Sequence, residues 1–77
     1  MNSQTLNFEI TINHNRFEVE YESEGPENNL IISILFHDFY LDISELIYSH
    51  LKVFIEIKNT MLNNADTYWS EKSKILN

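Results

Sequence analysis

Apolar and polar residues alternate in two neighbouring stretches near the amino terminus. From residue 6 to 12 and from residue 17 to 22, every second side chain is apolar. A β-strand sends successive side chains to opposite faces, so each stretch predicts a strand with one apolar face. Between them, His14-Asn15 predicts a two-residue hairpin turn, because both residue types tolerate positive φ. Such a turn places Ile12 opposite Phe17 and makes the two apolar faces coincide.

A row of glutamates occupies the polar face of the second predicted strand. Glu18, Glu20 and Glu22 lie on it, and Glu24 follows towards the next loop. The predicted turn places Glu9 directly opposite Glu20, and like charges in opposed positions destabilise a sheet. This cost favours a binding role for the five residues. The other interpretation is that the glutamates only solvate a small sheet and discourage pairing at its edge.

Residues 30–37 predict a third strand, which follows a loop containing the only glycine and the only proline. Apolar residues occur on both faces of this strand. If Ile34 and Phe36 join the core, Ile31 and Leu35 share the outer face with the glutamates. We therefore count Ile31 and Leu35 as part of the candidate partner-binding surface.

A capping box at Asp42 and Glu45 predicts that a helix begins near Ile43. Apolar residues recur at helical spacing from there to Trp69. A helix of that length reaches roughly 40 Å, whereas strands of about eight residues reach about 27 Å, so its distal third would overhang the sheet. Either the helix breaks near Asn63-Asn64 and a short helix follows, or a second copy or another partner covers the overhang. The residues of this candidate dimer or helix interface are Met61, Leu62, Ala65, Tyr68 and Trp69.

Together these elements predict one small α+β domain over residues 1–77, with a three-stranded antiparallel meander followed by a long amphipathic C-terminal helix. No apolar run approaches the about 18 residues of a membrane span. The first residues also lack the pattern of a signal peptide. We therefore expect a cytoplasmic protein without membrane contact.

Charge and residue chemistry point to binding rather than catalysis. The formal net charge is −7, and nine of the twelve acidic residues lie within residues 1–45, which disfavours direct contact with nucleic acid. The chain has no cysteine, and its three histidines lack metal-ligand spacing, so we expect neither a metal nor a cofactor. No catalytic motif is present, so we expect no enzyme activity.

In size, charge and composition the chain resembles the small acidic inhibitors that phages deploy against host defence, such as anti-CRISPR and anti-restriction proteins. The resemblance implies a nucleic-acid mimic that occupies a basic nucleic-acid-binding surface of an enzyme in the host cytoplasm. Two other classes stay open. One is an antitoxin or immunity protein that neutralises a nuclease toxin with the same acidic face. The other is a homo-oligomeric structural or assembly subunit whose acidic face is only solvated.

Overall fold

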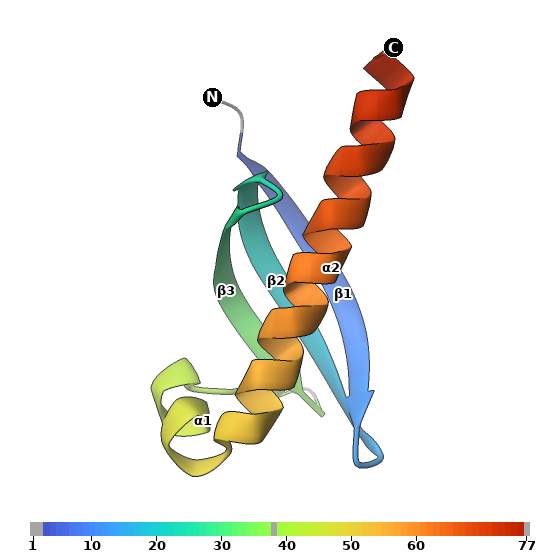
Figure 1. Cartoon of the computed structure of the whole chain (residues 1–77). Helices are drawn as coiled ribbons and strands as arrows, with labels where there is room; N and C mark the ends of the chain where they lie inside the picture. Colours follow the sequence, from blue (N-terminus) through green and yellow to red (C-terminus); the bar gives the residue numbers. More distant parts are fainter. Residues whose placement is uncertain (1–2, 38, 77) are drawn as a thin grey trace.

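The computed structural model describes residues 3–37 and 39–76, which form a sheet covered on one face by a long helix (Figure 1). The fold is α+β, as predicted, with a short fourth strand in addition to the expected three. Neighbouring strands are antiparallel and follow the order β1-β2-β3-β4. In chain order the elements are β1 (Gln4–Ile12), β2 (Asn15–Gly25), β3 (Asn28–Phe36), β4 (Phe39–Tyr40), α1 (Ile43–Ser49) and α2 (Leu51–Leu76).

The hairpin between β1 and β2 turns at Asn13-His14, one residue earlier than predicted. Both residues have positive φ, 51° and 68°, as the favoured two-residue hairpin turns require. Phe17 therefore pairs with Ile10, and the predicted pairing with Ile12 is wrong. Moving the turn by one residue moves each pairing by two positions. Because side chains alternate with a period of two, the apolar faces still coincide.

A β-bulge in β3 changes which of its side chains reach the core. Ser33 pairs with Glu20, but Ile31 pairs with the next residue, Tyr21, so Ile32 is the extra residue. Ile31 consequently packs against the buried clusters of the core, and its predicted place on the outer face is wrong. Beyond the bulge, Leu30 takes the position beside Glu22 instead.

The helical part of the chain is interrupted at His50 and not near Asn63-Asn64. Asp42 caps α1 as predicted, since its Oδ1 accepts a hydrogen bond of 2.8 Å from the Ser44 amide. His50 leaves the helical conformation with φ −141° and ψ 56°, and α2 starts directly after it. Each asparagine disfavours a helix by up to about 0.7 kcal/mol relative to alanine. The side chain of Asn64 offsets part of this, because it accepts a hydrogen bond from the Tyr21 hydroxyl. The alternative in which the helix breaks near Asn63-Asn64 is therefore wrong.

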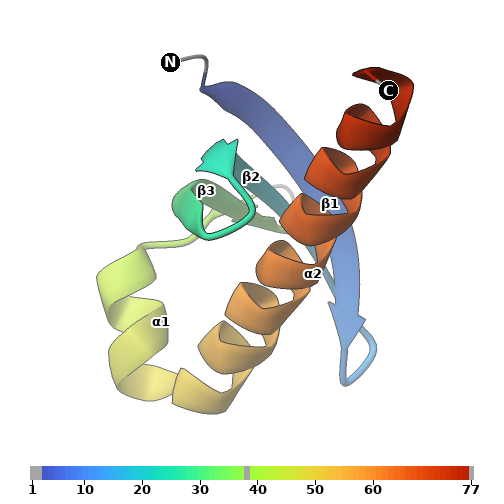
Figure 2. The ribbon, with the colours of Figure 1, turned by 45° about the horizontal axis from the view of Figure 1, so that its top comes forward.

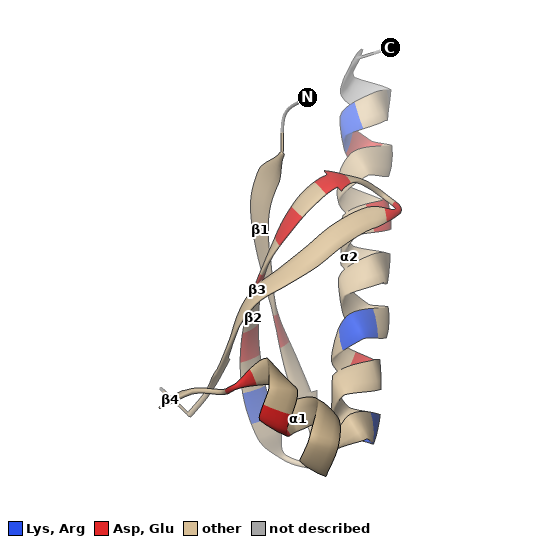
Figure 3. Cartoon of the chain, turned by 90° about the vertical axis from the view of Figure 1, so that its left-hand side faces the viewer, with Lys and Arg blue, Asp and Glu red and all other residues tan. Residues whose placement is uncertain are grey.

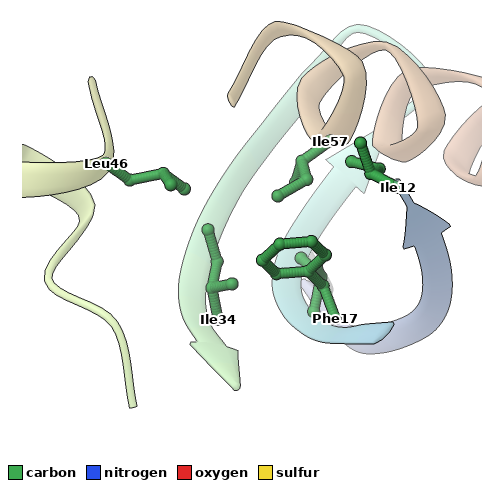
Figure 4. Packing of buried hydrophobic residues seen from close by; sticks show 6 residues of the cluster. Ile12, Phe17, Ile34, Leu46 and Ile57 are labelled. Atoms are coloured by element: carbon green, nitrogen blue, oxygen red, sulfur yellow. The ribbon is translucent and has the colours of Figure 1, made fainter. Parts of the chain in front are cut away.

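The turn at His50 allows α2 to run diagonally across the sheet (Figures 1 and 2). One buried cluster joins the sheet to α1 and to the first half of α2. Its side chains include Ile12, Phe17, Ile34, Leu46 and Ile57, which point towards one another between the layers (Figure 4).

A second buried cluster lies under the distal half of α2. Met61 and Ala65 are buried there with Tyr21, and Trp69 packs against them. The Trp69 Nε1 donates a hydrogen bond of 2.8 Å to Oγ of Ser23, which is also buried. The expectation that this part of the helix overhangs the sheet is wrong, because α2 begins only after α1 and follows the diagonal of the sheet.

Candidate functional site

The outer face of the sheet, meaning the face turned away from α2, carries the candidate site (Figure 3). In β2 the buried residues Phe17, Val19 and Tyr21 point towards α2. Since side chains alternate along a strand, the glutamates between and after them point to the outer face. We call Glu9, Glu18, Glu20 and Glu22 the acidic ladder.

The register sets which groups face one another in the acidic ladder. Glu9 pairs directly with Glu18, whereas Glu20 pairs with Asn7. The predicted opposition of Glu9 and Glu20 is therefore wrong, for the same reason as the predicted turn. Directly opposed side chains have Cβ atoms about 5 Å apart, and successive glutamates of β2 are about 6.8 Å apart. Like-charge repulsion is thus strongest between Glu9 and Glu18.

One basic side chain reaches the acidic ladder. Arg16 Nη2 lies 3.9 Å from Glu18 Oε1, and the two side chains are 60% and 42% exposed. Exposed ion pairs contribute about 0–1 kcal/mol, which is comparable to the repulsion between opposed like charges. Arg16 offsets part of the repulsion at Glu18 and leaves Glu20 and Glu22 without a cationic partner among the described residues.

The acidic surface extends past the end of the ladder. Glu22 Oε1 accepts a hydrogen bond of 2.8 Å from Ser3, and Glu24 Oε2 accepts one of 3.0 Å from Asn28. Glu24 stands at a second irregularity of the β2–β3 pairing. Together with Leu30, these glutamates line an open hollow of about 200 Å³. Glu24 therefore prolongs the acidic surface towards the loop, as its place in the sequence predicts.

A larger hollow of about 340 Å³ lies over the middle of the acidic ladder. Leu35 borders it from its position opposite Glu18, on the outer face as expected. Tyr40 borders it from β4, where it pairs with Leu35 and is 79% exposed. Carboxylates beside an exposed aromatic ring are groups that attract a cation, since the ring face also carries negative charge. Sequence reasoning missed Tyr40 because two strand residues are too few to show an alternating pattern.

The structure does not bring the five residues of the expected helix interface together on a free surface. Met61 and Ala65 are buried, and Trp69 is hydrogen-bonded to Ser23. Tyr68 is half-buried and contacts both the Trp69 ring and Lys72. Of the five, only Leu62 is exposed.

A titratable group with a shifted pKa, Tyr21, lies in the core. Burial raises the pKa of Tyr21 above its ordinary value. The neutral hydroxyl of Tyr21 donates a hydrogen bond to Asn64 Oδ1, which joins the sheet to α2. This arrangement favours a structural role for Tyr21, because the group sits beneath the helix and away from the hollows of the outer face.

The described residues contain neither a cluster of metal ligands nor a membrane-crossing helix. Within 3–37 and 39–76, no three histidine, aspartate or glutamate side chains gather as metal ligands do. None of the helices in these ranges has an apolar stretch of the length that a lipid bilayer requires. No protein-family model matches the chain, and neither does any curated protein or solved structure.

Proposed function

We propose that the protein is a small acidic binding protein that inhibits its target by covering a basic, nucleic-acid-binding surface with the outer face of its sheet. The observation that carries the proposal is the direct opposition of Glu9 and Glu18 within the acidic ladder. A lysine or glutamine at either position would stabilise the sheet better. Opposed like charges destabilise the sheet, and they lie on a face that no other element covers. Both features are consistent with a surface that serves binding.

The spacing of the carboxylates supports mimicry of nucleic acid. Glu18, Glu20 and Glu22 follow one strand at about 6.8 Å intervals, whereas one strand of DNA carries a phosphate per 3.4 Å of helix axis. The ladder thus has roughly half the linear charge density of a DNA strand. A channel that is lined with lysine and arginine attracts such a row over a distance of several ångströms.

The hollow beside the ladder supports a contact with protein rather than charge alone. Tyr40 and Leu35 supply apolar surface next to Glu18 and Glu20. Tyrosine is enriched among the residues that dominate binding energy at interfaces. An arginine of the target can pair with a carboxylate and stack on the Tyr40 ring at the same time.

In its specific form, the proposal is a phage-encoded anti-defence inhibitor of the anti-CRISPR or anti-restriction type, acting in the host cytoplasm. The support for this form is the resemblance in size, charge and composition. An antitoxin or immunity protein that neutralises a nuclease toxin would use the same outer face. The identity of the captured partner separates these two forms.

A pair of charge-matched triple variants tests the proposal. The ladder variant combines Glu18→Gln, Glu20→Gln and Glu22→Gln. The control variant combines three exposed acids of α2, as Glu56→Gln, Asp66→Asn and Glu71→Gln. Both remove three negative charges from the formal −7, so they differ only in which surface they change.

The wild-type chain and both variants are immobilised and used to capture proteins from a host lysate, which are identified by mass spectrometry. We expect a nucleic-acid-binding protein that the wild type and the control variant retain and the ladder variant loses. With the purified partner, duplex DNA should compete for binding. The ladder variant should associate about tenfold more slowly at low salt, since charge steers the encounter.

Two outcomes contradict the proposal. If the ladder variant captures the partner as tightly and as quickly as the wild type at low salt, the acidic ladder only solvates the sheet. If both variants lose the partner equally, overall charge matters and the outer face does not.

A further inference from the structure

A second exposed surface lies on one flank of α2. Leu51, Ile55 and Leu62 recur at helical spacing on one side of the helix, with Lys58 between the last two. They are 52%, 46% and 38% exposed. The core-facing side of the same helix is formed by other residues, including Ile57 and Met61. The flank is thus apolar without contributing to the core.

The flank continues into a groove between α2 and β3. Leu30, Phe54 and Lys58 line this groove, whose volume is about 210 Å³. Leu30 is 68% exposed at the edge of the sheet. Leu30 also borders the hollow beside Glu22 and Glu24, so it belongs to the acidic side as well. We define the helix-flank surface as Leu51, Phe54, Ile55, Lys58 and Leu62.

The size of this surface matches a weak dimer. Its three exposed apolar residues, Leu51, Ile55 and Leu62, leave roughly 250 Å² open, if a fully exposed leucine or isoleucine counts about 180 Å². A standard interface buries about 800 Å² per partner, of which about 65% is apolar in homodimers, or about 500 Å². The three residues supply about half of this area, and half-buried Phe54 adds to it.

Charge favours a second copy of the chain on this surface. The only charged member of the helix-flank surface is Lys58, and the acidic ladder lies on the face of the sheet turned away from α2. Two chains of net charge −7 can therefore meet here with their acidic faces pointing apart. Pairing along the free edge of β1 would instead align both acidic ladders in one continuous sheet, where like charges repel.

We propose that two copies associate through their helix-flank surfaces as a two-fold symmetric dimer, with a dissociation constant on the order of 10–100 μM. The two α2 helices run antiparallel, so that Leu51 packs against the partner's Leu62. The stem of Lys58 covers the partner's Ile55. The dimer presents two acidic faces on its outer sides.

Sedimentation equilibrium between about 1 and 500 μM tests this arrangement. The wild-type mass should rise from 9.2 kDa towards twice that value. Ile55→Glu and Leu62→Glu should each weaken the dimer at least tenfold. Asn63→Glu adds the same charge at the exposed neighbour of Leu62, on another side of the helix, and should dimerise like the wild type. Circular dichroism verifies that the variants keep their helix content.

Crosslinking through single cysteines checks where the two copies touch without introducing a charge into the interface. The chain contains no cysteine, so single cysteines can be introduced cleanly. Lys58→Cys should crosslink to its own copy through a short bis-maleimide at least tenfold faster than Asn63→Cys.

Three results overturn the proposal. A wild-type chain that stays at 9.2 kDa throughout shows that no dimer forms. A dimer that Ile55→Glu and Leu62→Glu leave unchanged shows that another surface, such as the edge of β1, holds it. Equal crosslinking at positions 58 and 63 contradicts the antiparallel contact. Capture of a target through the acidic ladder is independent of all three results.

Discussion

The hydrogen bond between Trp69 and Ser23 is one of the contacts that attach the distal half of α2 to the sheet. Ser23 is buried, and its Oγ accepts from Trp69 Nε1 while donating to the carbonyl of Gly25 at 3.1 Å. Trp69→Phe keeps an aromatic ring and removes the donor. The buried hydroxyl then loses one partner, so the free energy of unfolding should fall by about 1–2 kcal/mol. For a domain of this size, that corresponds to a decrease in Tm of about 5–15 °C.

Urea denaturation followed by far-ultraviolet circular dichroism measures this change, because the variant lacks the only tryptophan of the chain. A double-mutant cycle with Ser23→Ala isolates the contact. In the Ser23→Ala background, Trp69→Phe should cost about 1 kcal/mol less than in the wild type. Tyr68→Phe is the matched control: it removes a hydroxyl that accepts from Lys72, and it should change stability by less than about 0.5 kcal/mol.

The reasoning is refuted if Trp69→Phe is as stable as the wild type, or if the two substitutions in the cycle are simply additive. Either result would mean that the indole nitrogen does not anchor the helix. Trp69 would then again be a candidate for an interface with another chain, as its helical spacing predicts.

Three further predictions concern the core, the acidic ladder and pH. Val19 is 1% exposed, so Val19→Asp should bury an unpaired charge and abolish the cooperative thermal transition in circular dichroism; an unchanged midpoint would contradict this. Glu9→Gln relieves the opposition to Glu18 and keeps the contact with Arg16, so urea denaturation at low salt should show a gain of about 0.2–1 kcal/mol, which shrinks with added salt. A loss of stability would contradict the register. Burial raises the pKa of Tyr21, so the folded state holds the hydroxyl proton to higher pH than the unfolded state. The resulting stability is fully present below the unfolded pKa of about 10 and is lost as pH rises through the folded pKa. Tyr21→Phe should flatten this loss in urea denaturation between about pH 9 and 11, and equal losses in both proteins would refute the assignment.

The sequence by itself determined the class of the fold and the faces of the hairpin. Alternation with a period of two assigns Val19 to the core and Glu20 to the outer face, whichever residues form the turn. The prediction survived a turn misplaced by one residue, because the pairing then shifts by two positions and each side chain stays on its face. Asp42 likewise marks the start of α1 through a local hydrogen bond to the second residue after it. Such features depend on near neighbours in the chain, so sequence patterns record them.

Which residues form the site could be predicted only in part from the sequence. The glutamates of β2 could be assigned to one face, but the partner of Glu9 depended on the register, and Tyr40 depended on a strand of two residues. Apolar residues occupy both faces of β3, so no alternation revealed the bulge that exchanges Ile31 for Leu30.

The tertiary structure also decided the course of the helix. Its apolar spacing continues past both His50 and Asn63-Asn64, so the pattern could not show where the helix breaks. The break falls at His50, where it brings α2 back over the sheet. The asparagines remain helical where Tyr21 donates to Asn64. That contact joins residues 43 positions apart, and its contribution exists only once the sheet and the helix have packed together.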